Sequence, residues 1–294
     1  MKPYEWMIKY TPQTEWVDRR GILFWLAFFF IELGAGVFLV SSVFGVLQGE
    51  IIGWLICAVL GGGLHLLYLG HPFRFYRMVL RPQTSWISRG LIFVVGFLIL
   101  GAMHMALSAL TTVPIALLVI TDILAFLTII YGGFAMSCIN GIPLWNTALL
   151  PVLYVVAGLW GGAELTVSII LTSGAFTEFV SSVEGIARVL LVVFAFIVAV
   201  YLIGARYSST TGKVSVREIV VGRWKLLFWI GVVLIGVMLP LGVVVSSFIA
   251  TSEGIPISLL WLSISAGLLG DLVLRYLILK NGLYGPLIPA SQIV

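Results

Sequence analysis

Charged residues are scarce in this sequence. Only 10% of its 294 residues are Asp, Glu, Lys or Arg, whereas 61% are hydrophobic and the mean hydropathy is +1.16. Soluble domains contain about 25% charged and roughly 45–50% apolar residues. This composition excludes a soluble globular protein and predicts a polytopic membrane protein.

Residues that bind metals are also few. The two cysteines, Cys57 and Cys138, lie in apolar stretches far from any CxxC spacing, so they predict neither an iron–sulfur cluster nor a disulfide framework. A haem held between helices takes two axial ligands at matching depth, usually histidines. The three histidines, His65, His71 and His104, fall in the inner half of the membrane, in a loop and in the outer half. We therefore expect a chain without haem.

Long apolar runs are abundant. A helix needs about 20 apolar residues to cross a hydrocarbon core of ~30 Å. Eight runs have this length, at residues 22–46, 51–70, 90–110, 114–138, 147–172, 186–206, 224–250 and 255–280. We expect an all-α integral membrane protein of eight transmembrane helices. We expect two four-helix bundles, over residues 1–140 and 141–294.

The basic residues mark one end of the expected helices. Fourteen of the sixteen Lys and Arg residues precede the first run, lie between runs two and three or six and seven, or close the last run. By the positive-inside rule, both termini and these connections face the cytoplasm, in a multi-pass protein of the inner membrane. This topology explains the net charge of +4 without any nucleic-acid partner. The alternative that some of these basic residues dock a partner subunit stays open. The candidates for docking are Arg74, Arg77, Arg81 and Arg89, together with the aromatic residue Trp145.

Ionisable side chains inside the runs are the main candidates for function, because each costs at least ~2.5–3.5 kcal/mol at the bilayer centre unless it is paired or hydrated. They are Glu32, His65, His104, Asp122, Glu164, Arg188, Asp271 and Arg275. Helical rise places Glu32, His65 and the polar Tyr131 together in the inner half of the first bundle. Asp271 and Arg275, at i,i+4, can pair on one helix face.

These residues also have structural interpretations. A buried histidine or carboxylate can simply hold two helices together, and the Asp271–Arg275 pair fits a structural or field-shaping ion pair better than a catalytic one. Glu32 stands beside Gly34 and Gly36, small residues that let another helix or a flat ligand approach. We therefore predict a functional role for Glu32.

Several longer motifs identify a family. They are ELGAG at 32–36, LGHPFRF at 69–75, LRPQTSWISRG at 80–90, YGG at 131–133, PLWN at 143–146 with Leu150-Pro151, and GDLVLRY at 270–276. Together they resemble the NrfD-like family, the membrane subunit of polysulfide reductase-type complexes. The resemblance is dense through residue 165 and sparse after it.

The resemblance implies a haem-free, quinone-reactive subunit that binds a ferredoxin-like iron–sulfur subunit and usually a molybdopterin or other redox catalytic subunit. It places menaquinone or ubiquinone in the first bundle, at the membrane face that meets the iron–sulfur partner. Tyr131 matches a tyrosine associated with that site. The sequence departs from the family at residues 24–30, which are apolar where the polysulfide reductase subunit has polar Asn and His ligands. Glu32 or His65 could substitute for these ligands.

The predicted function is electron exchange between a quinone pool and an iron–sulfur partner in anaerobic respiration, with linked proton transfer. Proton-exchanging side chains must then lie at the ring oxygens, and Glu32, His65 and Tyr131 are the candidates. A proton path is expected to continue through His104, Asp122, Glu164, Arg188, Asp271 and Arg275. The alternatives are a proton-conducting or anchoring subunit without quinone, and a stand-alone secondary transporter with repeated broken helices.

Overall fold

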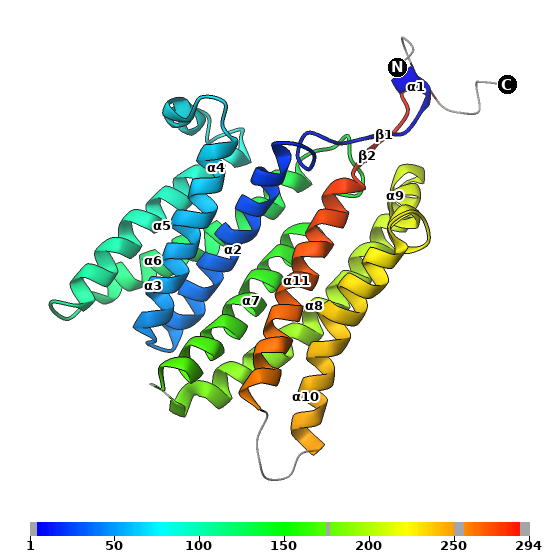
Figure 1. The fold of residues 1–294 in the computed structure, drawn as a ribbon. Helices are drawn as coiled ribbons and strands as arrows, with labels where there is room; N and C mark the ends of the chain where they lie inside the picture. Colours follow the sequence, from blue (N-terminus) through cyan, green and yellow to red (C-terminus); the bar gives the residue numbers. More distant parts are fainter. Residues whose placement is uncertain (1–4, 175–176, 250–255, 289–294) are drawn as a thin grey trace.

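The computed structural model describes residues 5–174, 177–249 and 256–288. The structure does not describe the end of the expected run 224–250 or the start of the expected run 255–280. The charged residues Lys2 and Glu253 also lie outside these ranges. Within them, eight helical segments are long and apolar enough to cross a membrane, and they lie side by side (Figure 1). The expected all-α fold with eight transmembrane helices is confirmed.

Six of the spans are single helices, and two contain π-helical stretches. In chain order the spans are α2 (Gly21–Val43), α3 (Leu47–Leu55) with η1 (Ile56–Gly62) and α4 (Gly63–Tyr68), α5 (Trp86–Ser108), α6 (Ile115–Ser137), α7 (Leu149–Ser173), α8 (Val180–Ser208), η4 (Leu227–Met238) with α10 (Leu239–Ile249), and α11 (Ile257–Lys280). The second and seventh spans are the ones that widen into π-helix, at η1 and η4. The shorter elements are α1 (Glu5–Ile8), β1 (Thr11–Pro12), η2 (Pro72–Leu80), η3 (Thr177–Phe179), α9 (Thr210–Val220) and β2 (Leu283–Tyr284).

Helices α2 and α7 form the centre of the protein and pack against each other. Glycines permit this approach, because a Cβ atom on Gly36 would overlap the backbone of Gly158, and one on Gly162 would overlap the backbone of Gly36. Small residues at such positions are typical of membrane helices in close contact. The contact joins the two expected bundles, and their division at residue 140 stays a prediction.

We expect Gly162→Val to prevent α2 and α7 from reaching this packing distance. Overpacking against a backbone that cannot move aside costs about 1–3 kcal/mol or more. Folded protein in the membrane should fall and its thermal transition in detergent should drop. Gly185→Val on α8 is the matched control, since a Cβ at Gly185 meets nothing within 4 Å. Equal stability of the two variants would contradict the packing argument.

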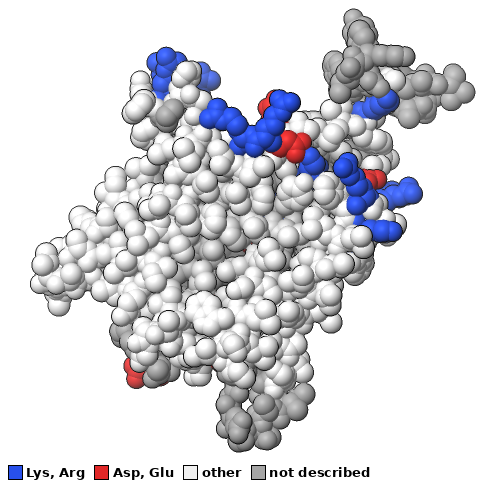
Figure 2. Space-filling view, viewed as in Figure 1, with Lys and Arg blue, Asp and Glu red and all other residues white. Residues whose placement is uncertain are grey.

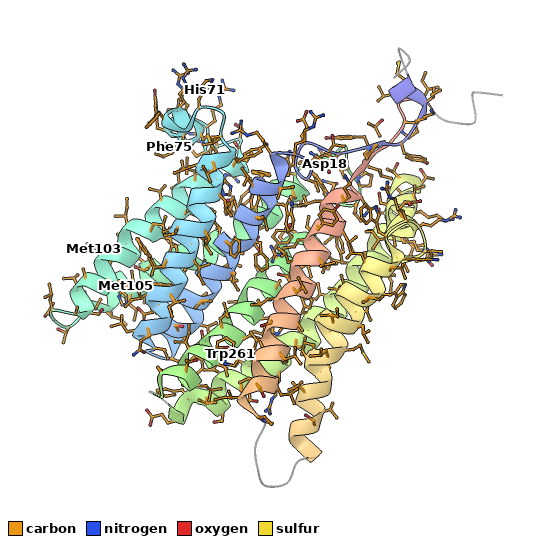
Figure 3. The ribbon with its side chains drawn as sticks, viewed as in Figure 1. Asp18, His71, Phe75, Met103, Met105 and Trp261 are labelled. Carbon is orange, nitrogen blue, oxygen red and sulfur yellow. The ribbon has the colours of Figure 1, made fainter. Side chains whose placement is uncertain are left out.

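The basic side chains gather at one end of the molecule, where the described ends of the chain also lie (Figure 2). There β1 pairs with β2 in antiparallel register. Lys280, at the end of α11, donates a hydrogen bond of 2.6 Å to Asp18, which is labelled in Figure 3. The segment before α2 is thereby tied to the segment after α11. We call this the basic end of the protein.

Candidate functional site

A cavity of about 430 Å³ lies among the first four spans, near the basic end. Its walls come from the segment before α2, from α2, the second span, η2, α5 and α6. The lining residues are Trp16, Phe24, Phe28, Ile31, Ala58, Gly62, His65, Leu66, Tyr68, Leu69, Phe75, Met78, Ile87, Leu91, Val94, Val95, Leu98 and Tyr131. The lining is mostly apolar and aromatic, with few polar groups.

His65 and Tyr131 are the two predicted site residues that line this cavity. The His65 Nδ1 atom lies 3.3 Å from the Gly61 carbonyl oxygen of its own helix. Within the described ranges, the Nε2 atom of His65 and the hydroxyl of Tyr131 have no hydrogen-bond partner. The ring of Phe28 stands beside both, 5.3 Å from His65 and 5.4 Å from Tyr131 between centroids. Two polar groups are thus free to bind a ligand within an aromatic enclosure.

Two motif glycines shape the cavity wall. A Cβ atom on Gly90 would overlap the Tyr131 ring, so only glycine leaves the ring its place. A Cβ atom on Gly132 would come within 2.7 Å of Glu32 Oε1 and 2.8 Å of the Phe28 ring. Gly90, from the motif at 80–90, and Gly132, from the motif at 131–133, therefore both leave room for side chains of the same site.

Glu32 lies behind this wall and belongs to a separate buried ion cluster. Its Oε2 atom accepts from Arg275 Nη1 at 2.5 Å, and Arg275 Nε donates to Asp271 Oδ2 at 2.9 Å. All three side chains are buried, and the guanidinium lies 4.4 Å above the Tyr154 ring. The expected pairing of Asp271 with Arg275 is present. The expected grouping of Glu32 with His65 and Tyr131 needs correction, since Glu32 does not line their cavity.

Phe28 separates Glu32 from the cavity. It lies one helical turn before Glu32 on α2 and its ring lines the cavity. The second carboxylate oxygen of Glu32, Oε1, is buried and has no hydrogen-bond partner among the described residues. That oxygen faces Gly132, the neighbour of Tyr131. A free carboxylate oxygen thus lies directly behind the ring that forms the cavity wall.

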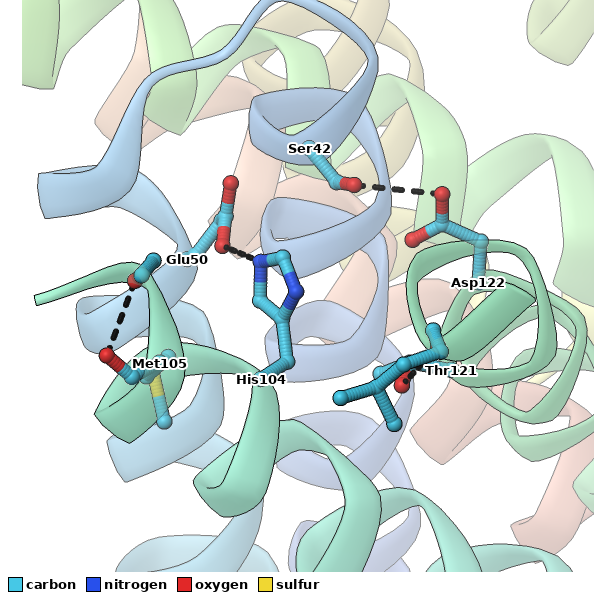
Figure 4. A network of polar contacts seen from close by, with 8 residues as sticks. Ser42, Glu50, His104, Met105, Thr121 and Asp122 are labelled. Atoms are coloured by element: carbon cyan, nitrogen blue, oxygen red, sulfur yellow. Dashed lines mark hydrogen bonds and ion pairs between the residues drawn. The ribbon is translucent and has the colours of Figure 1, made fainter. Parts of the chain in front are cut away.

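A second polar cluster lies in the other half of the first four spans (Figure 4). His104 Nε2 lies 2.8 Å from Glu50 Oε2, and Ser42 Oγ donates to Asp122 Oδ2 at 3.1 Å. His104 Nδ1 and Asp122 Oδ1 are buried without partners in the described part of the chain. Glu50 was not expected here, because its position suggested a connection between runs. The helix begins earlier, at Leu47, so Glu50 belongs to the second span and is buried there.

Glu164 and Arg188, which also belong to the predicted proton path, each have a partner on their own helix. Trp160 Nε1 donates to Glu164 Oε1 at 3.2 Å, and Arg188 Nη2 lies 2.5 Å from Glu184 Oε1. Hydrogen bonds among the described residues do not connect Glu32 to the cluster in Figure 4. The described side chains thus form separate polar clusters, and the proton path through them stays a prediction.

Of the residues expected at a docking surface, Trp145 needs correction. Its side chain is fully buried, and its Nε1 atom donates to the Ile278 carbonyl oxygen at 2.8 Å. It holds the end of α11 and cannot contact a partner directly. Arg89 is half-buried and bonds the carbonyl oxygens of Pro82 and Gln83 at 2.6 and 2.7 Å, so it holds its own loop. The exposed candidates are Arg74, Arg77 and Arg81.

Among the described residues, no three His, Cys, Asp or Glu side chains stand close enough to share a metal ion. Comparison with known proteins identifies the family. The family model described as "Polysulphide reductase, NrfD" matches residues 20–285. This chain belongs to the NrfD family. With eight apolar helices in the part of the chain that the structure describes, it is a multi-pass membrane protein.

Two curated relatives support the assignment to the NrfD family. Protein NrfD of Escherichia coli (strain K12) is 29% identical over 209 residues, which cover 69% of this chain and 61% of that protein. The C subunit of polysulfide reductase from Wolinella succinogenes is 31% identical over 170 residues, which cover 56% of this chain and 52% of that protein. The matched part therefore spans less than two thirds of each relative. In this member of the NrfD family, the family motifs contribute Leu69, Phe75, Ile87 and Tyr131 to the cavity.

Proposed function

We propose that this NrfD protein is the quinone-reactive membrane subunit of a respiratory redox complex. It exchanges electrons between the quinone pool and a ferredoxin-like iron–sulfur partner, with linked proton transfer. The observation that carries this proposal is an apolar, aromatic cavity lined by two polar atoms that have no partner among the described residues, His65 Nε2 and the Tyr131 hydroxyl oxygen.

The cavity has the properties that a quinone needs. Sites for small organic ligands are usually concave, mostly apolar, about 300–1,000 Å³ in volume, and contain a few polar groups that fix orientation. The volume of about 430 Å³ falls in this range, and His65 and Tyr131 come from different helices, the second span and α6. Menaquinone or ubiquinone supplies the two-electron, two-proton chemistry when bound.

The chain itself contributes orientation and proton exchange. The Tyr131 hydroxyl would donate a hydrogen bond to a ring oxygen. Because His65 Nδ1 donates to the Gly61 carbonyl oxygen, the Nε2 atom of the neutral ring is an acceptor and would take a proton from a quinol hydroxyl. Phe24 and Phe28, whose ring centroids lie 4.7 Å apart in edge-to-face contact, form an aromatic wall that would lie against the quinone ring and exclude water. Glu32 is a carboxylate paired with Arg275, and its Oε1 atom, which has no partner among the described residues, is where it would take up and pass on a proton near the site.

The basic end is the side on which we place the partners. The exposed residues Arg74, Arg77 and Arg81 lie close to the cavity, on and beside η2, and offer positive charge to an iron–sulfur subunit that also binds a molybdopterin subunit. By the positive-inside rule, this end and both termini face the cytoplasm of an inner membrane. The cluster of Glu50, His104 and Asp122 serves proton exchange in the outer half.

Two neighbouring glycines test the quinone site. Gly62 lines the cavity, and the nearest atom to a Cβ there is 3.7 Å away, so the side chain of Gly62→Leu would enter the space that the ring needs. Quinone extracted from the purified complex should fall at least about tenfold, and quinone-linked turnover with it. Gly63→Leu is the matched control, because Gly63 has nothing within 4 Å and does not line the cavity.

Both variants should retain the activity of the catalytic subunit with an artificial dye, which shows that the complex is assembled. Full quinone content in Gly62→Leu would contradict this cavity as the site. Absence of quinone and of quinone-linked turnover in the wild-type complex would favour the anchoring function instead.

A further inference from the structure

We propose that the cavity opens sideways to the lipid, through a portal between α4 and α5, and that the apolar tail of the bound ligand lies in this portal. The inference rests on the proposed quinone function and specifies how the ligand reaches the site. The ligand class is a planar polar head with a long prenyl tail, taken directly from the bilayer.

The exposure of the lining residues shows where the cavity opens. Its deep wall is buried, with Phe28 at 6% and Tyr131 at 4% exposure. Its rim is exposed, with Leu66 on α4 at 45%, Ile87 on α5 at 41% and Val95 on α5 at 38%. These rim residues are apolar and lie within membrane spans, so the opening faces hydrocarbon. The polar residues His65 and Tyr131 thus lie inside the cavity, and apolar residues surround its opening.

The portal has a floor and a roof. Below it, Trp54 Nε1 donates to the Leu98 carbonyl oxygen at 2.9 Å and fixes α3 against α5. Above it, Phe75 and Met78 of η2 line the cavity, and Figure 3 shows Phe75 on the segment that caps the ends of α4 and α5. A ligand that leaves the cavity between Trp54 and η2 therefore enters the lipid beside α5.

The sequence of the second span explains why the two helices stay apart at this level. Just above Trp54 the chain enters the π-helical turn η1, and the residues that it presents to the cavity are Ala58 and Gly62. Neither has a side chain long enough to reach across to α5. A π-helical turn is uncommon and is often associated with a functional site. The small residues keep open a gap that a Leu or Phe would close.

Exposed apolar residues on η2 support an interfacial position for the roof. Phe73, Tyr76 and Leu80 are exposed, and so is Phe75, which lines the cavity together with Met78. The basic residues Arg74 and Arg77 alternate with them along η2. Exposed aromatic residues beside arginines are suited to the level of the lipid headgroups, where these arginines can also meet a partner subunit. A tail below it would lie in hydrocarbon.

The test narrows the portal and compares ligands with and without a tail. In proteoliposomes containing the intact complex, Val95→Trp should lower the ratio of kcat/KM for menaquinone over tail-less menadione by at least about tenfold. Leu66→Trp, on the opposite rim, should do the same. Val119→Trp, an exposed substitution on α6 outside the cavity lining, should leave the ratio unchanged.

An unchanged ratio in both rim variants, with normal dye activity, would overturn the portal while leaving the quinone site in place. If the wild-type complex turns over neither quinone, the proposed function fails and the portal with it. The two failures are therefore distinguishable.

Discussion

Replacing Arg275 with methionine is expected to give the largest loss of stability of any single substitution in the ion cluster. The change removes the partner of two buried carboxylates, Glu32 at 2.5 Å and Asp271 at 2.9 Å. Breaking a buried ion pair by removing one partner costs about 3–5 kcal/mol, because the remaining charge has neither water nor a counter-ion. Folded Arg275→Met protein in the membrane should fall to a small fraction of the wild-type amount, measured by fluorescence-detected size exclusion.

The companion variants of this experiment separate charge from packing. Glu32→Gln leaves the Arg275–Asp271 pair intact and should be milder. Combining Arg275→Met with Glu32→Gln and Asp271→Asn removes all three charges and should recover much of the folded protein. Lys280→Met is the control, because its bond to Asp18 lies at the partly exposed surface, where such pairs contribute about 0–1 kcal/mol. Equal stability of Arg275→Met and Lys280→Met would show that the two buried carboxylates do not need the charge of Arg275 to balance them.

Much of the fold could be predicted from composition and run length, since each apolar run of membrane-spanning length became a helix. The local pair Asp271–Arg275 was equally predictable, because residues at i,i+4 share a helix face whatever the tertiary structure. The common cavity of His65 and Tyr131 followed from their depth in neighbouring spans. These predictions depend on local sequence or on depth, which a membrane fixes.

The features that escaped prediction depend on contacts between distant segments. Arg275 reaches Glu32 across 243 positions in the sequence, and no local pattern indicates that the first and last spans meet there. Trp145 looks like a surface residue in a loop, yet it is buried against the end of α11. Glu50 was missed for a local reason, because an acidic residue at the edge of an apolar run is hard to assign to helix or loop. Gly49, next to Glu50, is also buried, and no sequence pattern predicted this burial.

The glycine motifs were recognisable as a resemblance before they had a physical explanation. The structure supplies that explanation through side chains that occupy the space of an absent Cβ. Gly90 accommodates the Tyr131 ring and Gly132 accommodates Glu32 and Phe28. The motifs therefore specify the position of Tyr131 and Glu32 as much as the path of the backbone.

The position of Tyr131 makes its hydroxyl the most informative atom in the cavity. We expect Tyr131→Phe to lower quinone-linked turnover by about 10²–10⁴-fold, the usual contribution of a positioned proton-exchanging group. The ring and its packing against Gly90 remain, so the complex should assemble and keep its dye-linked activity. Tyr201→Phe is the control, because its hydroxyl is also buried but donates to the Leu144 carbonyl oxygen, away from the cavity.

Glu32→Gln provides the comparison that divides binding from proton supply. Because Glu32 lies behind Phe28 and does not line the cavity, the variant should slow quinone-linked turnover without reducing the quinone bound to the purified complex. Tyr131→Phe should reduce both, since its hydroxyl faces the ligand directly. If turnover is normal in Tyr131→Phe and Glu32→Gln alike, neither residue exchanges protons with a quinone, and this chain would serve the complex as an anchor.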